Sequence, residues 1–466
     1  MQPFIRGIKY DIKGNTKTFY EGTVHPLRHF SPLKNTLYFR FTRERRFTLF
    51  FFLNTLQTEK NQLILSEFQT GENCMAVAKK IENSIKNSSL IRKMFEEGLK
   101  RKAEFGEDNV YDFSLGNPNL EPPAAFKEVL RDLINDPVPG RHGYMPNAGY
   151  DYTRQAVADY LSRNNQGKSA SGDIVMTVGA GGGMNVILKT LLDPGDEVII
   201  PSPYFMEYNF YIGNHQGVPR PIPTTKDFSL DLDAIKEAIC EKTKAVLINS
   251  PNNPTGKVYT KEELLDLAGL LEKSSSRLGR TIYLISDEPY RKLTYDGIKV
   301  PGIFDIYRES IISTSFSKDL SLPGERIGYV AVNPDISGKD TVTAGLILSN
   351  RILGFVNAPA LMQRAIPSLM DASVDISFYK KNRDMLCEGL ASFGYRFIKP
   401  QGAFYLFPET PIKDDVEFVS ILKDENILTV PGSAFGRSGY IRIAYCTSPK
   451  VIERSLPGFE KAMKKV

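Results

Sequence analysis

The chain has 466 residues, of which 41% are hydrophobic and 24% are charged, and its net charge is +5. This is enough for a large core and too long for one ordinary domain, so we expect one large and one smaller domain. The four cysteines and four histidines have neither metal-ligand nor disulfide-framework spacing, which predicts no metal site and a reducing, cytoplasmic setting.

Residues 1–74 differ in composition from the rest of the chain. They carry 11 Lys and Arg against 6 Asp and Glu, whereas the other 392 residues carry 48 of each. The body of the protein has no basic excess, so we expect neither nucleic acid nor membrane as a partner. The most apolar stretch of the segment, residues 47–53, is too short to span a bilayer.

Met75 precedes a helical pattern of apolar residues. These residues are Ile81, Ile85, Ile91, Met94, Phe95 and Leu99. The codons for Gly71 and Glu72 can form a purine-rich ribosome-binding site just before Met75. One hypothesis is that Met75 is the true start and residues 1–74 are a non-native leader. The alternative is a genuine, disordered extension, and both stay open.

Between residues 121 and 354, short apolar runs alternate with helical patterns. The predicted strands are Ile174–Val178, Glu197–Ile200, Ala245–Asn249, Ile282–Ser286, Ser310–Thr314 and Ile327–Val332. The helices between them include Met184–Leu192, Leu232–Ile239 and Lys261–Glu272. This alternation predicts a large α/β domain with a mostly parallel sheet. Ligands of such sheets bind beyond the carboxyl ends of the strands.

The pattern changes in residues 355–466. A long helix is predicted over Ala358–Phe393, followed by short strands around Ala403–Phe407 and Tyr440–Ile443. We expect a smaller α+β domain here. Residues 75–120 would supply an N-terminal helix and complete that domain.

A glycine-rich run, Gly179-Ala180-Gly181-Gly182-Gly183, is predicted to form a loop between a strand and a helix. Small residues let the backbone approach an anion, and a helix start points free N–H groups at it. A simple tight turn explains the run equally well. Further along the chain, Ser315 and Arg326 offer charge-assisted hydrogen bonds to a phosphate.

Two polar residues follow predicted strands. Asp287 ends a very apolar strand, and a buried carboxylate there needs a cation such as a pyridinium N–H. Tyr290, three residues on, and Asn253, in a loop dense in turn formers, can donate to the phenolate oxygen of such a ring. Taken alone, Asp287 fits a helix cap and Asn253 fits a turn at least as well.

Lys318, in Ser315-Phe316-Ser317-Lys318, is the residue that unites these features. A free lysine, with a pKa of about 10.4, is a poor nucleophile at neutral pH. A Schiff base with an aldehyde cofactor overcomes this, and pyridoxal phosphate (PLP) needs the ring and phosphate partners just described. Arg442 lies in an apolar strand, where it suits either a substrate carboxylate or a structural salt bridge.

Residues 76–466 resemble the class I/II aminotransferases, which are fold-type I PLP enzymes of the aspartate aminotransferase superfamily. The matching motifs follow the family's order. They are Leu115-Gly116-Asn117-Pro118, Tyr144-Met145-Pro146-Asn147-Ala148-Gly149, the 179–183 run, Ser202-Pro203-Tyr204-Phe205, residues 250–256, Asp287-x-x-Tyr290, Ser315-x-x-Lys318 with Arg326, Gly402-Ala403-Phe404-Tyr405, and Val430-Pro431-Gly432 followed by Arg442.

The resemblance implies a role for each site residue. Lys318 would hold PLP and carry the proton, Asp287 would pair with the pyridinium, and Asn253 and Tyr290 would bind the phenolate oxygen. The implied phosphate ligands are Gly179, Ala180, Gly181, Ser315 and Arg326. Phe205 would stack on the ring in place of the family's usual tryptophan, with Tyr204 less suited. The implied ligands of the substrate carboxylate are Gly116, Asn253 and Arg442.

The resemblance further implies a homodimer with shared active sites, in which Tyr144 reaches the phosphate bound by the other subunit. The implied reaction is a ping-pong transamination between amino acids and 2-oxo acids. A C–S lyase on the same scaffold and a ligand-sensing transcription regulator are the alternatives. Arg351 is a candidate for reading a distal substrate carboxylate across the dimer, although a surface or interface arginine fits better.

Overall fold

The computed structural model describes residues 4–10, 17–23, 38–41, 47–50, 77–86, 90–164 and 167–466. The chain separates into two units, residues 1–85 and residues 86–466. The first unit contains two antiparallel strand pairs. These are β1 (Phe4–Tyr10) with β2 (Lys17–Thr23), and β3 (Tyr38–Phe41) with β4 (Phe47–Phe50). The two interpretations of residues 1–74 remain predictions, because the junction at Met75 lies outside the described residues.

After Met75, the described residues include two helices, α2 (Lys79–Lys86) and α3 (Leu90–Phe105). Residues 87–89, between these helices, are not among the described residues, so the single helix predicted here stays a prediction.

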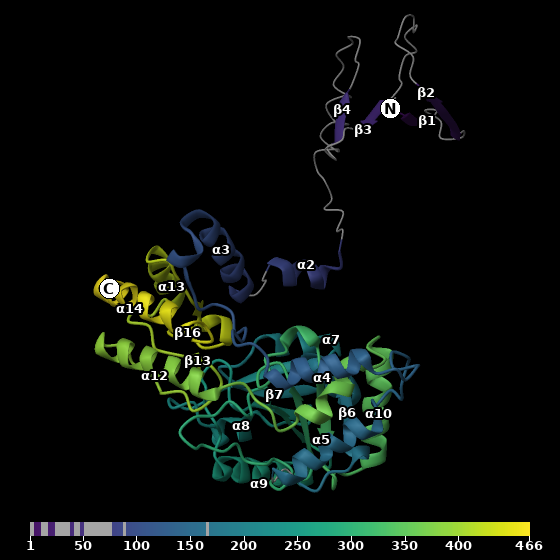
Figure 1. Ribbon diagram of the computed structural model, residues 1–466, viewed down its shortest axis with the longest axis vertical. Coiled ribbons are helices and arrows are strands. Elements are labelled where there is room, and N and C mark those ends of the chain that lie inside the picture. Colours follow the sequence, from purple (N-terminus) through teal and green to yellow (C-terminus); the bar gives the residue numbers. More distant parts are fainter. Residues whose placement is uncertain are drawn as a thin grey trace, which may run out of the picture. The chain divides into compact units, whose positions relative to one another are not determined.

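The second unit is built on a seven-stranded sheet with the order β6-β12-β11-β10-β9-β7-β8. Figure 1 labels β6 and β7 of this sheet among the surrounding helices. The strands are β6 (Ile174–Thr177), β7 (Glu197–Ser202), β8 (Val218–Pro223), β9 (Thr243–Asn249), β10 (Tyr283–Asp287), β11 (Ser310–Ser315) and β12 (Gly328–Val332). Neighbouring strands are parallel except for β12, which runs antiparallel to β11 and β6. The predicted α/β architecture with a mostly parallel sheet is confirmed.

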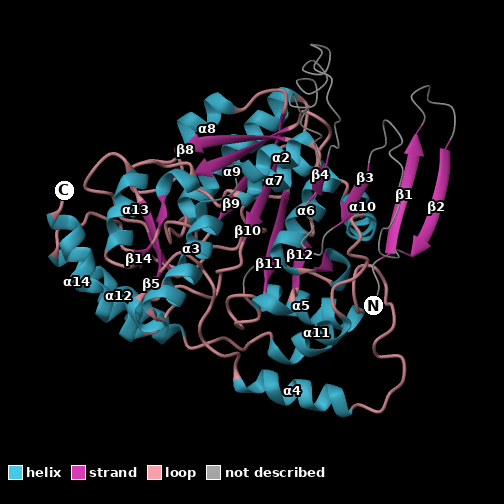
Figure 2. Ribbon diagram, turned by 90° about the horizontal axis from the view of Figure 1, so that it is seen from above, coloured by secondary structure: helices cyan, strands magenta, loops and turns pink. Residues whose placement is uncertain are grey.

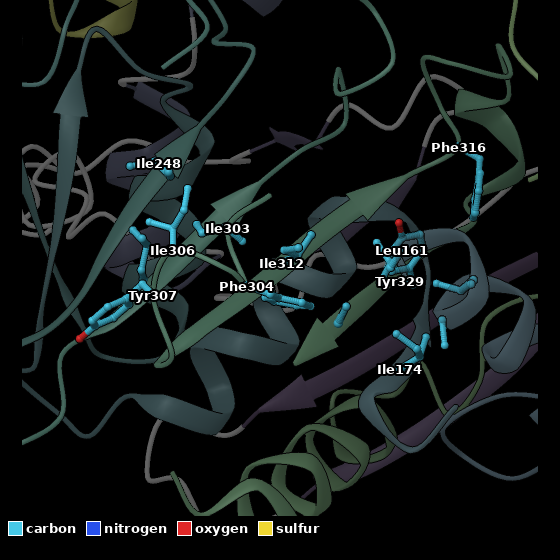
Figure 3. Packing of buried hydrophobic residues seen from close by; sticks show 14 of the residues in the cluster. Leu161, Ile174, Ile248, Ile303, Phe304, Ile306, Tyr307, Ile312, Phe316 and Tyr329 are labelled. Atoms are coloured by element: carbon cyan, nitrogen blue, oxygen red, sulfur yellow. The ribbon is translucent and has the colours of Figure 1, made fainter. Parts of the chain in front are cut away.

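Helices cover both faces of this sheet (Figure 2). One face packs against α4 (Ala124–Asn135), α5 (Asp151–Arg163), α8 (Leu232–Ala238), α9 (Lys261–Leu278) and α11 (Ala360–Ala365). The other packs against α6 (Gly179–Leu191), α7 (Glu207–Asn214) and α10 (Lys339–Ile352). Side chains alternate between the two cores along each strand, so Ile248 and Ile312 belong to the first core, part of which Figure 3 shows, and Leu247 and Ile311 to the second.

A third core lies in the C-terminal part of the unit, where β13 (Tyr405–Leu406), β16 (Ile441–Ala444) and β15 (Val430–Pro431) form a small antiparallel sheet. The helices there are α12 (Ile376–Ser392), α13 (Asp415–Asp424) and α14 (Pro449–Lys464). Residues before 120 take part, since β5 (Tyr111–Asp112) pairs with β14 (Ile427–Leu428). The division at residues 120 and 354 remains a prediction. None of the described helices is long and apolar enough to cross a bilayer.

The long helix predicted over Ala358–Phe393 is wrong. The structure instead has α11, the 3-10 helix η4 (Ile366–Leu369), a break, and then α12. The Asp375 side chain accepts a hydrogen bond from the Ser377 amide at 2.9 Å and so starts α12. The remaining short elements are the 3-10 helices η1 (Glu107–Asn109), η2 (Ser171–Asp173), η3 (Pro323–Glu325) and η5 (Gly432–Phe435).

Candidate active site

The sheet brings the predicted site residues to one edge. The carboxyl ends of β7, β9, β10 and β11 meet there because these strands are parallel. Strand β12 runs the other way, so its first residue, Gly328, pairs with Ser315 of β11 and Thr177 of β6. A cavity of about 300 Å³ lies at this edge. The predicted residues that line it are Gly116, Ala180, Gly181, Phe205, Asn253, Asp287, Tyr290, Ser315, Lys318, Arg326 and Arg442.

Four residues considered from the sequence do not line the cavity. Gly179 is buried beside it, under the Arg326 guanidinium. Tyr204 is buried and donates to Asn209 Oδ1 at 3.0 Å. Tyr144 is 94% exposed, and Arg351 is exposed in the last turn of α10. The proposed roles of Tyr144 and Arg351 across a dimer therefore stay predictions.

Lys318 projects its amine into the cavity, where Nζ donates a hydrogen bond to the Gly116 carbonyl oxygen at 2.7 Å. The pKa of Lys318 is lowered to about 8, chiefly by burial and also by the cations Arg442 and Arg326, while Cys446 acts in the opposite direction. A lysine with this pKa is unprotonated far more often at neutral pH than a free one. The amine is thus suited to act as a nucleophile or a base.

Asp287 ends β10 as a fully buried carboxyl group. The Tyr208 hydroxyl donates to its Oδ2 at 2.5 Å, and the Asn249 amide donates to its backbone carbonyl at 2.9 Å. The pKa of Asp287 is raised to about 7, chiefly by burial and also by the nearby Glu288, while the hydrogen bond from Tyr208 acts in the opposite direction. A cationic ligand beside this group would favour its ionised form. No motif in the sequence points to Tyr208, which lies within α7.

Arg442, in β16, is buried among aromatic rings. Its Nη1 donates to Asn253 Oδ1 at 3.1 Å and its Nη2 to the Ser114 carbonyl at 2.5 Å. The guanidinium carbon lies 4.7 Å from the ring centroids of both Tyr405 and Phe435. Its buried Nε has no hydrogen-bond partner within the protein. A buried arginine with an unused N–H is equipped to bind a planar anion.

Tyr405 is the second site residue without a predicted role. Its hydroxyl lies 2.8 Å from the hydroxyl of Tyr290, and both side chains are buried. Residue 116 must be glycine, because a Cβ there would collide with the Tyr405 hydroxyl. The two tyrosines and Gly116 form the wall of the cavity between Lys318 and Arg442.

The prediction of a loop for the glycine-rich run is wrong. The run forms the first turns of α6, which begins at Gly179. Close packing explains why residue 183 is a glycine: a Cβ there would come within 2.6 Å of Ser313 Oγ. The run is helical although glycine has a low helix propensity. Gly179 itself has φ +76°, and a Cβ there would come within 2.8 Å of Arg326 Nη2. The free N–H groups of the helix start and a guanidinium lie side by side, which suits a phosphate.

Comparison with known proteins agrees with this geometry. The sequence profile of the family "Aminotransferase class I and II" matches residues 108–457. The chain belongs to the class I and II aminotransferases. A crystal structure of an amino transferase from Eubacterium rectale is similar to it, with a TM-score of 0.82 and 40% identity over 84% of this chain and 99% of that one.

Two curated relatives are also aminotransferases. A probable aspartate/prephenate aminotransferase of Aquifex aeolicus is 33% identical over 77% of this chain and 92% of that protein. Aromatic-amino-acid aminotransferase 2 of Thermococcus litoralis is 30% identical over 84% and 99%, respectively. The predicted family and amino-acid transamination are confirmed, and these similarities favour neither the lyase nor the transcription regulator.

Proposed function

We propose that this aminotransferase works in two half-reactions on one PLP group held covalently by Lys318. An amino acid leaves its amino group on the cofactor and departs as a 2-oxo acid, and a second 2-oxo acid then takes the amino group away. The observation that carries the proposal is the convergence of Lys318, Asp287 and Arg442 on one cavity. These three side chains match the aldehyde, the ring nitrogen and the substrate carboxylate.

The residues present fit PLP. The buried carboxyl group of Asp287, whose pKa of about 7 reflects burial, is matched by a protonated ring nitrogen. The start of α6, Ser315 and Arg326 are matched by the phosphate. Asn253 and Tyr290 offer hydrogen-bond donors for the phenolate oxygen, and Phe205 offers a ring face. When bound, PLP supplies an aldehyde that takes up the amino group and a ring that accepts the electron pair of the broken α C–H bond.

Lys318 has two tasks in this proposal. Its Nζ would hold the cofactor between turnovers, and would accept the proton of the substrate α-carbon when a substrate amine takes its place. Because Nζ then carries that proton, Lys318 could also donate it later in the same half-reaction. Its pKa of about 8 lies close to neutral pH, which suits both the acceptance and the donation of a proton.

Arg442 orients the substrate. Its Nε and one Nη can receive the α-carboxylate as a bidentate partner, with Asn253 and Gly116 alongside. This fixes the α-carbon beside Lys318, whose Nζ already contacts the Gly116 carbonyl. The names of the relatives point to aspartate, prephenate and aromatic amino acids as the first donors and acceptors to assay. Assaying the Arg351→Ala variant with that panel tests whether Arg351 binds a distal carboxylate of the substrate.

The proposal is tested with purified protein, a panel of amino donors and 2-oxoglutarate. We expect continuous turnover with an acceptor, and about one equivalent of 2-oxo acid per site without one, because the amino group stays on the enzyme. Borohydride should trap the cofactor on Lys318, and Lys318→Ala should abolish turnover. Continuous release of pyruvate and ammonia without an acceptor, or full turnover by Lys318→Ala, would refute the proposal.

A further inference from the structure

Behind the cavity lies an ion pair that the reaction described above does not use. The ammonium of Lys292 is 3.2 Å from the carboxylate of Asp319, and the two side chains are only 18% and 9% exposed. Lys292 Nζ also donates to the carbonyl oxygens of Met370 at 2.6 Å and Ala372 at 3.2 Å, and it lies 4.9 Å from the ring centroid of Tyr160. Three acceptors satisfy the three protons of the ammonium, so it is held in one position.

Both members of this pair are close in sequence to site residues. Asp319 directly follows Lys318, and Lys292 comes two residues after Tyr290. The carbonyl oxygen of Asp319 also accepts a hydrogen bond from the Val374 amide at 2.7 Å. The backbone that carries Lys318 is therefore joined to residues 370–374 twice, once by this hydrogen bond and once through Lys292.

Residues 370–374 are the break in the helix that the sequence predicts over residues 358–393. The carbonyl groups of Met370 and Ala372 bind Lys292 instead of continuing a helical hydrogen-bond ladder. The break leads from Leu369, in the core beneath the sheet, to Tyr379, in the C-terminal core. Lys292 thus binds a chain segment that links these two cores.

We propose that Lys292 and Asp319 are positioning residues for the reaction. Together they hold Lys318 and residues 370–374 in one relative arrangement, so that Nζ of Lys318 meets the substrate α-carbon in the geometry that proton transfer needs. This inference rests on the proposed role of Lys318 as proton carrier. A proton carrier displaced by a fraction of an ångström still binds substrate, so the loss should appear in kcat more than in KM.

The test uses the cofactor-loaded enzyme with Lys292→Met, which keeps the length of the side chain and removes its charge. We expect kcat to fall on the order of tenfold with little change in KM. The isotope effect on kcat with an α-deuterated donor should rise, because proton transfer becomes the slow step. In the protein without substrate, amide hydrogen exchange should speed up in peptides covering residues 316–322 and 370–376.

The matched control is Lys339→Met. Lys339 forms an ion pair with the buried carboxylate of Asp173, and neither residue lines the cavity. This variant should lose stability, yet keep the wild-type isotope effect and the wild-type exchange of both peptides. If Lys292→Met behaves in the same way as Lys339→Met, the inference is overturned.

Asp319→Asn and the double variant Lys292→Met/Asp319→Asn separate two effects, the displacement of Lys318 and the presence of an unpaired buried charge. The double variant leaves no unpaired buried charge, so it should regain stability while its isotope effect stays raised. An isotope effect that returns to the wild-type value in the double variant would overturn the inference. Failure of the proposed function is a separate result, since it would appear as turnover by Lys318→Ala.

Discussion

The titration of Asp287 should make the free energy of unfolding of the cofactor-free protein depend on pH. Burial raises its pKa from the ordinary 3.8 to about 7. The folded state therefore binds this proton more tightly than the unfolded state does. The stability that this difference contributes is fully present below pH 4, and it is lost as the pH rises from 4 through 7. At about 1.4 kcal/mol per pKa unit, the loss is roughly 4 kcal/mol. Urea unfolding of the cofactor-free protein between pH 4 and pH 8 measures it.

Two variants control this prediction. Asp287→Asn removes the titrating group, so the fall in unfolding free energy between pH 4 and 7 should become smaller by that amount. Tyr208→Phe removes a hydrogen bond that lowers the pKa of Asp287, so the fall should extend to higher pH. An identical pH profile for Asp287→Asn and the wild type would contradict the prediction.

At the scale of elements, the start of α6 depends on one backbone conformation. Gly179→Ala would force a Cβ into the left-handed region and to within 2.8 Å of Arg326 Nη2. Displacement of this guanidinium should weaken PLP binding about tenfold or more, given a strain of roughly 1–3 kcal/mol. Equilibrium titration of the cofactor-free protein with PLP measures the change.

Gly195→Ala is the matched control for the helix start. Gly195 also has a positive φ, +89°, but a Cβ there would meet nothing within 4 Å. It should therefore cost folding stability without changing the affinity for PLP. Equal loss of PLP affinity in both variants would show that backbone strain alone, and not the contact with Arg326, sets the binding.

The elements that the sequence predicts well are those buried on both sides. Runs such as residues 245–248 are apolar throughout because both faces of the sheet are covered. Strand β8 was missed because its sequence, Val-Pro-Arg-Pro-Ile-Pro, has a proline at every second position. A strand tolerates this at a sheet edge, where β8 lies. The apolar pattern of residues 358–393 does not show the break at residues 370–374, where the carbonyl groups of Met370 and Ala372 bind Lys292, a residue distant in sequence.

The residues of the site also divide into those that the sequence predicts and those that it does not. Lys318, Asp287 and Asn253 were predictable because each follows a strand, and parallel strands bring their carboxyl ends together. Tyr208 and Tyr405 gave no such signal. Their roles come from single hydrogen bonds to Asp287 and Tyr290, which join segments more than 75 residues apart. Only the folded structure shows these contacts.

At the scale of the whole molecule, the exposed stretch around Tyr144 supports the proposed dimer. Ile134 is 74% exposed, Val138 is 48% exposed and Tyr144 is 94% exposed. Exposed large apolar side chains within one short segment suit a segment that a partner subunit covers. If Tyr144 contacts the phosphate bound by a second subunit, each active site is complete only in the dimer.

Hybrid dimers test this sharing of sites. Lys318→Ala alone should be inactive, and Tyr144→Phe alone should have low activity at limiting PLP. In a mixed dimer, one site carries both defects and the other carries neither, because its Lys318 and its Tyr144 come from different subunits. Random reassembly of equal amounts should therefore restore about a quarter of the wild-type activity. If the mixture shows only the sum of its two parents after subunit exchange is verified by mass, the active sites are not shared through Tyr144.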